Sequence, residues 1–153
     1  MDNAAMYKAR ETHEVDPPYQ AAHAPRPATV LVVDDEPEVR EVVTRILQRG
    51  GYEVYCAADG QAAIERVAQA QPQIDCILLD MTMLGLSGRQ TFDLLQARWP
   101  GLPVVLMSGC AESAMSHGLN LHYPSVFVQK PFNIAELQRI VARLIAESQV
   151  RTA

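Results

Sequence analysis

The sequence predicts a doubly wound α/β domain, in which a parallel β-sheet carries helices on both faces. Short apolar runs alternate with helical patterns five times between Thr29 and Ala146, and strict alternation of this kind is typical of parallel sheets. Right-handed crossover connections then place helices on both faces. Polar residues follow most of the apolar runs, as expected where the carboxyl ends of strands form a binding crevice.

The first strand–helix unit is well specified. Residues 29–33 (TVLVV) form a β-branched apolar run, which indicates a buried strand. Pro37 lies among acidic residues at the start of the next pattern, and apolar residues then recur at helical spacing until Gly50 and Gly51. Proline and acidic side chains favour the start of a helix, and glycine favours its end.

The second and third units follow the same pattern. We expect the second strand at 52–57, followed by a helix that begins at Asp59 and ends before Pro72. The third strand is expected at 74–79 and its helix at 87–98. Each strand is a short apolar run that ends at polar or turn residues.

The fourth and fifth strands are expected at 103–108 and 125–129, with a weakly specified helix at 111–122 between them. The last helix is the best specified, because Asn133 and Glu136 can form a capping box ahead of an apolar stripe. The stripe consists of Ile134, Leu137, Ile140, Val141, Leu144 and Ile145.

The rest of the chain gives the expected domain organisation. Residues 1–27 are polar and rich in proline and are expected to be disordered or loosely held, residues 28–147 form the domain, and 148–153 form a tail. No output domain is expected, because only ESQVRTA follows the last helix. There is no signal peptide or membrane-length apolar run, so we expect a cytoplasmic protein without membrane contact, and the net charge of −5 argues against nucleic-acid binding.

Two smaller expectations concern single residues. Asp75 interrupts the third strand and is expected at its exposed start. The cysteines are expected to be reduced, buried thiols, because each lies among apolar neighbours. They are Cys56, Cys76 and Cys110.

Charged and polar residues lie at the carboxyl ends of four of the predicted strands. The first strand ends in Asp34 and Asp35, the third in Asp80, the fourth in Ser108 and the fifth in Lys130. The second strand ends in Cys56-Ala57-Ala58, as expected if it lies to one side of the site. Because parallel strands present their carboxyl ends at one edge of the sheet, these side chains are expected to converge there.

The chemistry of this set points to a metal-assisted phosphoryl site. Three close carboxylates repel one another unless a cation lies between them. Oxygen donors favour Mg²⁺, and the absence of histidine or cysteine from these motifs argues against zinc. An ionised aspartate beside Mg²⁺ can attack a phosphoryl group, while Lys130 and Ser108 contact its oxygens. Lys130 is notable because 11 of the 13 basic residues are arginine.

Four segments resemble the receiver domain of two-component response regulators. They are VLVVDDEPEVREVV, ILLDMTMLGLSG, PVVLMSG and VFVQKPF, and the resemblance extends from about Thr29 to Ala146. It implies a flavodoxin-like, five-stranded parallel sheet of order 2-1-3-4-5 with five helices. The terminal receivers of hybrid histidine kinases, stand-alone receivers and phosphorelay intermediates are all compatible with it.

The resemblance implies a role for each strand-end residue. Asp80 would be the phosphoacceptor, and Mg²⁺ would be held by Asp34, Asp35, Asp80 and the main-chain carbonyl of Thr82. Ser108 would be the switch hydroxyl, and Lys130 would contact the phosphoryl group.

Two further positions take their roles from the same resemblance. Phe127 would occupy the switch-aromatic position. Pro131 would follow a cis peptide bond, an isomer found almost only before proline.

The implied partners are proteins. A sensor histidine kinase or a histidine phosphotransfer protein would donate the phosphoryl group. An unknown downstream protein would bind the face formed by the fourth helix, the fifth strand and the fifth helix, and the chain would be a monomer or weak dimer. The weak pattern at 111–122 predicts that this face is mobile and is ordered by phosphorylation or by a partner.

One position departs from the family pattern, and two others are positions that influence the rate of phosphate loss in the family. Leu84 stands where the family usually has proline, which predicts a less rigid loop after Asp80. Thr82 and Cys110 occupy positions where the family varies its rate of phosphate loss, and neither can orient a water with an acid or an amide. We therefore expect a long-lived acyl phosphate.

Two alternatives remain open at this point. The first is a Mg²⁺-dependent phosphohydrolase of the haloacid dehalogenase type, which would need a second aspartate at the position of Thr82 and a cap insertion that this sequence lacks. The second is a receiver-like interaction module that is never phosphorylated, although such a module would not need the acids, the hydroxyl and the lysine.

Overall fold

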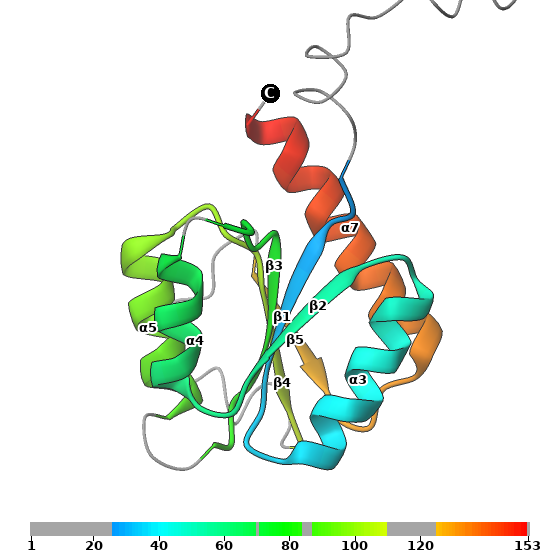
Figure 1. The fold of residues 1–153 in the computed structure, drawn as a ribbon. Coiled ribbons are helices and arrows are strands. Elements are labelled where there is room, and N and C mark those ends of the chain that lie inside the picture. Colours follow the sequence, from blue (N-terminus) through cyan, green and yellow to red (C-terminus); the bar gives the residue numbers. More distant parts are fainter. Residues whose placement is uncertain (1–25, 70, 84–86, 110–124, 153) are drawn as a thin grey trace, which may run out of the picture.

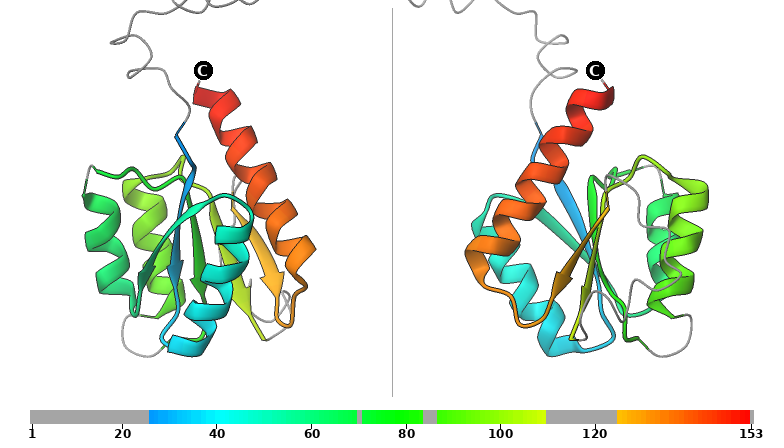
Figure 2. Two further views of the ribbon diagram at one scale, coloured as in Figure 1. Left: turned by 45° about the vertical axis from the view of Figure 1, so that its right-hand side comes forward. Right: turned by 180° about the vertical axis from the view of Figure 1, so that it is seen from behind.

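The computed structural model of the chain describes residues 26–69, 71–83, 87–109 and 125–152. Its centre is a five-stranded parallel sheet of order β2-β1-β3-β4-β5, which confirms the predicted class and strand order. Helices α4 and α5 cover one face of the sheet, and α3 and α7 cover the other (Figure 1). Two further views show the same three layers (Figure 2).

The elements lie close to their expected positions. The strands are β1 Thr29–Val33, β2 Glu53–Ala57, β3 Cys76–Asp80, β4 Val104–Ser108 and β5 Val126–Gln129. The described helices are α3 Pro37–Arg49, α4 Gly60–Ala68, α5 Gly88–Arg98 and α7 Ile134–Thr152. The fifth expected helix, at 111–122, lies outside the described residues, as does most of the N-terminal extension.

The two faces of the sheet carry separate apolar cores, because successive side chains of a strand point to opposite faces. In β1, Val30 and Val32 pack with α3 and α7, whereas Leu31 and Val33 pack with α4 and α5. The central strands β1, β3 and β4 are buried at every position. Burial on both faces explains why these strands appear in the sequence as continuous apolar runs.

Side-chain caps fix where several helices begin. Asp59 Oδ1 accepts a hydrogen bond from Ala62 N at 2.7 Å, and Asn133 Oδ1 accepts one from Glu136 N at 2.6 Å. Ser87 and Gln90 form a complete capping box at the start of α5. These caps satisfy backbone N–H groups that a helix start leaves without partners, and they place each helix directly after its loop.

The end of α7 differs from the expected boundary. The helix continues to Thr152, so the segment predicted as a tail from residue 148 extends the helix instead. The physical reason is composition: the segment ESQVR contains good helix formers and neither glycine nor proline. The C-terminal end of α7 and the start of β1 lie at the same end of the sheet (Figure 1).

Two single-residue expectations are wrong. Cys76 is buried, but Cys56 is exposed because β2 is an edge strand of the sheet. The side chain of Asp75 is only 12% exposed, because Arg26 lies over it in an ion pair. Cys110 is outside the described residues. No helix in the described part of the chain has the length and apolar character needed to cross a bilayer.

Candidate functional site

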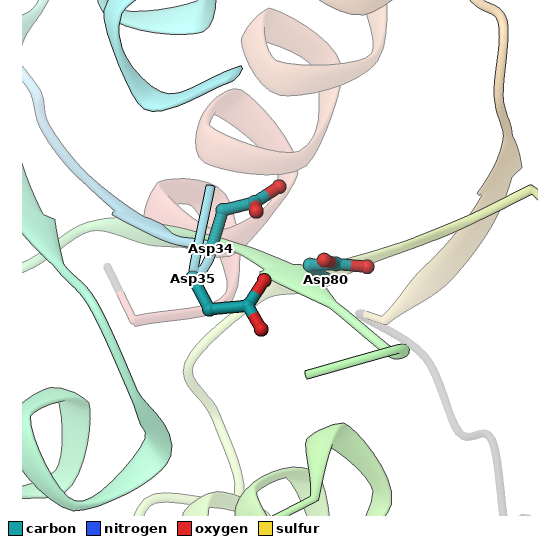
Figure 3. Close-up of side chains that lie close together, drawn as sticks. All are labelled: Asp34, Asp35 and Asp80. Atoms are coloured by element: carbon teal, nitrogen blue, oxygen red, sulfur yellow. The ribbon is translucent and has the colours of Figure 1, made fainter. Parts of the chain in front are cut away.

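Three carboxylates meet at the carboxyl end of the sheet. Asp34 and Asp35 follow β1, and Asp80 is the last residue of β3. One oxygen from each lies within 4.8 Å of the others, and the three side chains lie side by side (Figure 3). Asp34 and Asp80 are buried and Asp35 is half-buried. The convergence predicted from strand ends is therefore present for the three acids.

The sheet register accounts for this convergence. Val33 of β1 is paired with Leu79 of β3, so Asp34 and Asp80 follow paired residues on neighbouring strands. The Asp34 amide donates to Ala57 O at 3.2 Å, which extends the contact of β1 with β2 by one residue. The Glu36 amide donates to Asp34 Oδ1 at 2.9 Å and holds one carboxylate oxygen against the turn.

The electrostatic environment of Asp34 is unfavourable to its charge. Burial raises the pKa of its carboxyl, and the neighbouring charge of Asp80 raises it further. The Glu36 amide and the Lys130 ammonium act in the opposite direction, but the net direction of the pKa is upward. A cation between the carboxylates would stabilise the ionised form of Asp34, in agreement with the cation predicted from the sequence.

Lys130 reaches the acids from the end of β5, across β4. Its Nζ lies 3.4 Å from Asp34 Oδ2 and 3.7 Å from Asp80 Oδ1. Its backbone amide donates to Ser108 O at 2.7 Å, which joins the ends of β5 and β4. The peptide bond between Lys130 and Pro131 is cis, as the resemblance predicts.

The two carboxylate oxygens of Asp80 have different surroundings. Oδ1 accepts hydrogen bonds from the Thr82 amide at 3.1 Å and the Thr82 hydroxyl at 2.9 Å. Oδ2 is buried and has no hydrogen-bond partner within the described residues. Buried polar atoms are nearly always paired, so a buried oxygen without a partner, beside two further carboxylates, indicates a position for a ligand.

The donor set fits a hard divalent cation. The ligands available at this point are carboxylate oxygens, which Mg²⁺ prefers, and the cluster contains neither histidine nor cysteine. Mg²⁺ typically uses one or two carboxylates, retains several waters and binds a phosphate. Partial exposure of Asp35 leaves a route for these waters and for the phosphate.

The other predicted site residues lie near this cluster or outside the described part of the chain. Ser108 is fully buried at the end of β4, next to Lys130. Phe127 is half-buried in β5 and packs against the core on the α4–α5 side. Thr82 is exposed, and its amide and hydroxyl contact Asp80. Leu84 and Cys110, which the sequence analysis also singled out, lie outside the described residues.

Two residues at the site were missed by the sequence analysis. Arg40 Nη1 donates to the backbone carbonyl of Asp34 at 2.7 Å. Gly88 packs directly on the end of β3, since a Cβ there would lie 2.5 Å from Met81 Cα and 2.6 Å from Asp80 O. The signals available were weak: an arginine one turn into an otherwise acidic helix start, and a glycine immediately after the cap Ser87.

Comparisons with known proteins identify the family of this chain. The sequence matches the family model of the response regulator receiver domain over residues 30–142. The probable transcriptional regulatory protein TcrX of Mycobacterium tuberculosis is 35% identical over 130 residues, which are 83% of this chain and 53% of TcrX. The sensor kinase CckA of Brucella abortus is 32% identical over 118 residues, which are 77% of this chain and 12% of CckA. The chain thus spans about half, or much less, of the length of these relatives.

A solved structure agrees with the sequence relatives. The receiver domain of NtrX from Brucella abortus is 28% identical, with a TM-score of 0.68, over 76% of this chain and 98% of that domain. Similarity over nearly the whole of that domain matches the extent of the sheet and helices described above.

Proposed function

Because this chain belongs to the response regulator receiver family, we propose that it is a phosphorylation switch in which Asp80 accepts a phosphoryl group in a Mg²⁺-dependent reaction. The observation that carries the proposal is the buried Asp80 Oδ2, which has no hydrogen-bond partner within the described residues and lies beside two further carboxylates. Lys130 Nζ lies 3.7 Å from the other oxygen of the same carboxylate.

The metal would be held by Asp34, Asp35, Asp80 and the main-chain carbonyl of Thr82. Bound Mg²⁺ would neutralise charge on the phosphoryl oxygens and offset the repulsion among the acids. The cluster geometry supports the three carboxylates as ligands, and the upward direction of the Asp34 pKa supports a site that is completed by a cation.

The transfer itself is a direct displacement at phosphorus. One carboxylate oxygen of Asp80 forms the new P–O bond while the P–N bond to the donor histidine breaks, and the departing imidazole nitrogen keeps the electron pair. Thr82 holds Oδ1 through two hydrogen bonds, which fix the orientation of the Asp80 carboxylate for in-line transfer. Lys130 contacts one phosphoryl oxygen as a compact charge, and the Ser108 hydroxyl donates to another.

The donor is a sensor histidine kinase or a histidine phosphotransfer protein. An apolar hollow of about 410 Å³ lies between α3 and the start of α7. Lys130 lines this hollow and also contacts the acidic cluster, so the hollow lies beside the site. Its other lining residues are Glu38, Val39, Val42, Val43, Pro131 and Phe132. Val42 is 57% exposed there, and a hollow with a mainly apolar lining beside a transfer site supports docking of a protein donor.

The signal leaves the domain as a change in partner binding. On phosphorylation the Ser108 hydroxyl moves toward the phosphoryl group, and Phe127 moves inward with it. An unknown downstream protein binds the face that the sequence analysis predicted for output, of which the structure describes β5 and α7. We place the chain in the cytoplasm, where its phosphodonors act, as a monomer or weak dimer.

The acyl phosphate is expected to be long-lived. Thr82 and Cys110 carry no acid or amide that could orient a water for attack. The Thr82 hydroxyl is engaged with Asp80 Oδ1. Alanine substitution at either position should leave the rate of phosphate loss unchanged or lower, and faster loss would contradict this expectation.

One experiment separates the proposal from its alternatives. We expect the chain to incorporate a single phosphoryl group from acetyl phosphate with Mg²⁺, detected by intact mass, and to lose this label when Asp80 is changed to Ala. Sustained turnover of a generic phosphate ester would favour a phosphohydrolase. A chain that binds Mg²⁺ but takes up no phosphoryl group would be an interaction module.

A further inference from the structure

Arg40 makes a contact with the site that the proposed chemistry does not use. Its side chain is half-buried on α3, and Nη1 donates to the Asp34 carbonyl at 2.7 Å. The register of β1 with both neighbouring strands ends at Val33, so the Asp34 carbonyl lies one residue beyond the paired strand. Arg40 therefore supplies a hydrogen bond where the sheet ladder has ended.

The contact closes the corner between β1 and α3. The Arg40 amide donates to Glu36 O at 3.1 Å in the first turn of the helix, and the Glu36 amide donates to Asp34 Oδ1. The Arg40 side chain returns to the Asp34 backbone, so hydrogen bonds join the end of β1 to the first turn of α3. Asp35 lies between Asp34 and Glu36, whose hydrogen bonds hold the chain on either side of it.

We propose that Arg40 is a positioning residue that holds Asp34 and Asp35 facing Asp80, and that it acts through its hydrogen bond to the Asp34 carbonyl. The inference rests on the proposed function, since it concerns the same metal site. Loss of a residue that orients metal ligands without touching the metal typically weakens metal binding by about 10- to 100-fold.

The sign of the effect separates positioning from simple charge. A guanidinium beside a cation site repels the cation, so a role through charge alone means that removing Arg40 strengthens Mg²⁺ binding. A positioning role gives the opposite result, because the two carboxylates lose their fixed orientation.

The test measures Mg²⁺ binding by isothermal titration calorimetry on the wild-type chain, Arg40→Met and Arg40→Lys. We expect Arg40→Met to weaken binding about tenfold, and Arg40→Lys, which keeps a donor, to recover part of the loss. Unchanged or tighter binding by Arg40→Met would overturn the inference, as would a lysine variant that recovers nothing. Should Arg40→Met not fold, Arg40→Leu decides in the same way, because it too removes both the charge and the hydrogen-bond donor.

Arg45→Met is the matched control. Arg45 lies on the same helix, is exposed and pairs with Glu41, so its loss should leave Mg²⁺ affinity unchanged. Thermal unfolding of each variant without metal separates a loss of fold from a loss of site geometry. A wild-type chain that binds no Mg²⁺ would refute the proposed function itself, whereas wild-type binding with an unaffected Arg40→Met variant would refute only the role of Arg40.

Discussion

The two ends of the sheet both hold aspartates, but in opposite surroundings. At the amino end, Asp75 accepts hydrogen bonds from two guanidinium nitrogens of Arg26, at 2.8 and 2.9 Å, and from the Thr29 amide at 2.8 Å. At the carboxyl end, Asp34 and Asp80 are buried beside a third carboxylate. One Asp80 oxygen there has no hydrogen-bond partner within the described residues.

This difference distinguishes a carboxylate that stabilises the fold from one that is held for a ligand. Asp75 is fully hydrogen-bonded, so it fixes the point where the chain enters β1. At the carboxyl end, Asp34 raises the energy of the folded chain, because burial and the neighbouring charge of Asp80 oppose its ionised form and raise its pKa. Such a cost persists where the site needs the charge for chemistry.

The largest expected difference between the two ends is in phosphorylation after the same Asp-to-Asn substitution. Asp80→Asn removes the nucleophile and should abolish phosphorylation completely, while relieving repulsion and leaving the metal-free fold at least as stable as wild type. Asp75→Asn should be phosphorylated at the wild-type rate. Intact mass after acetyl phosphate treatment checks both. A labelled Asp80→Asn variant would show that the phosphoryl group is carried elsewhere.

Glycines at the two ends give the next largest contrast. A Cβ at Gly88 would lie 2.6 Å from Asp80 O, whereas a Cβ at Gly101, at the amino end, would meet nothing within 4 Å. We expect Gly88→Ala to lower the free energy of unfolding by about 2–3 kcal/mol, because the end of β3 must shift. Gly101→Ala should be neutral or slightly stabilising. Urea unfolding measures both, and equal effects would contradict the close packing of α5 on Asp80.

The amino-end ion pair should contribute a smaller amount. Asp75→Asn weakens the hydrogen bonds to Arg26 and to the buried Thr29 amide, and we expect a loss of about 1 kcal/mol in the free energy of unfolding. Asp93→Asn is the control, since Asp93 is exposed on α5. High salt should reduce the Asp75 effect, because Arg26 is 49% exposed and the pair is partly screened. No difference between the two variants would show that the pair is only a surface contact.

The sequence was sufficient to predict the sheet and its strand-end acids. Parallel topology relates strand ends by a simple rule, so Asp34, Asp35, Asp80 and Lys130 could be placed together without coordinates. Strands such as β3 are buried on both faces and give an unmistakable apolar run.

Contacts between a side chain and a distant backbone could not be predicted in this way. Arg40 reaches the Asp34 carbonyl and Arg26 covers Asp75 because of rotamers and loop paths that leave no periodic pattern in the sequence. Exposure of Cys56 was missed although the predicted order places its strand at the sheet edge, because apolar neighbours in the sequence do not by themselves bury a side chain of an edge strand. The extension of α7 was missed because a helix without a stop residue has no marked end.

The smallest expected effect is a pH dependence from Asp34. Its folded-state pKa is raised above the ordinary value of 3.8, so the folded chain binds a proton more readily than the unfolded chain. The stability that this proton gives is present at low pH and is lost as pH rises through the raised pKa. In metal-free buffer at neutral pH, Asp34→Asn should therefore be more stable than wild type, and the difference should shrink as pH falls toward 3.8.

Addition of Mg²⁺ should reverse the order of these two proteins. The metal binds the folded state and stabilises wild type by RT ln(1 + [L]/Kd), which is about 1.4 kcal/mol at ten times Kd. Asp34→Asn lacks one ligand and should gain much less, while Asp75→Asn should gain as much as wild type. Urea unfolding with and without Mg²⁺ measures the three responses. If Asp34→Asn gained as much as wild type, the cation would lie outside the acidic cluster, and the buried charge at this end of the sheet would need another cause.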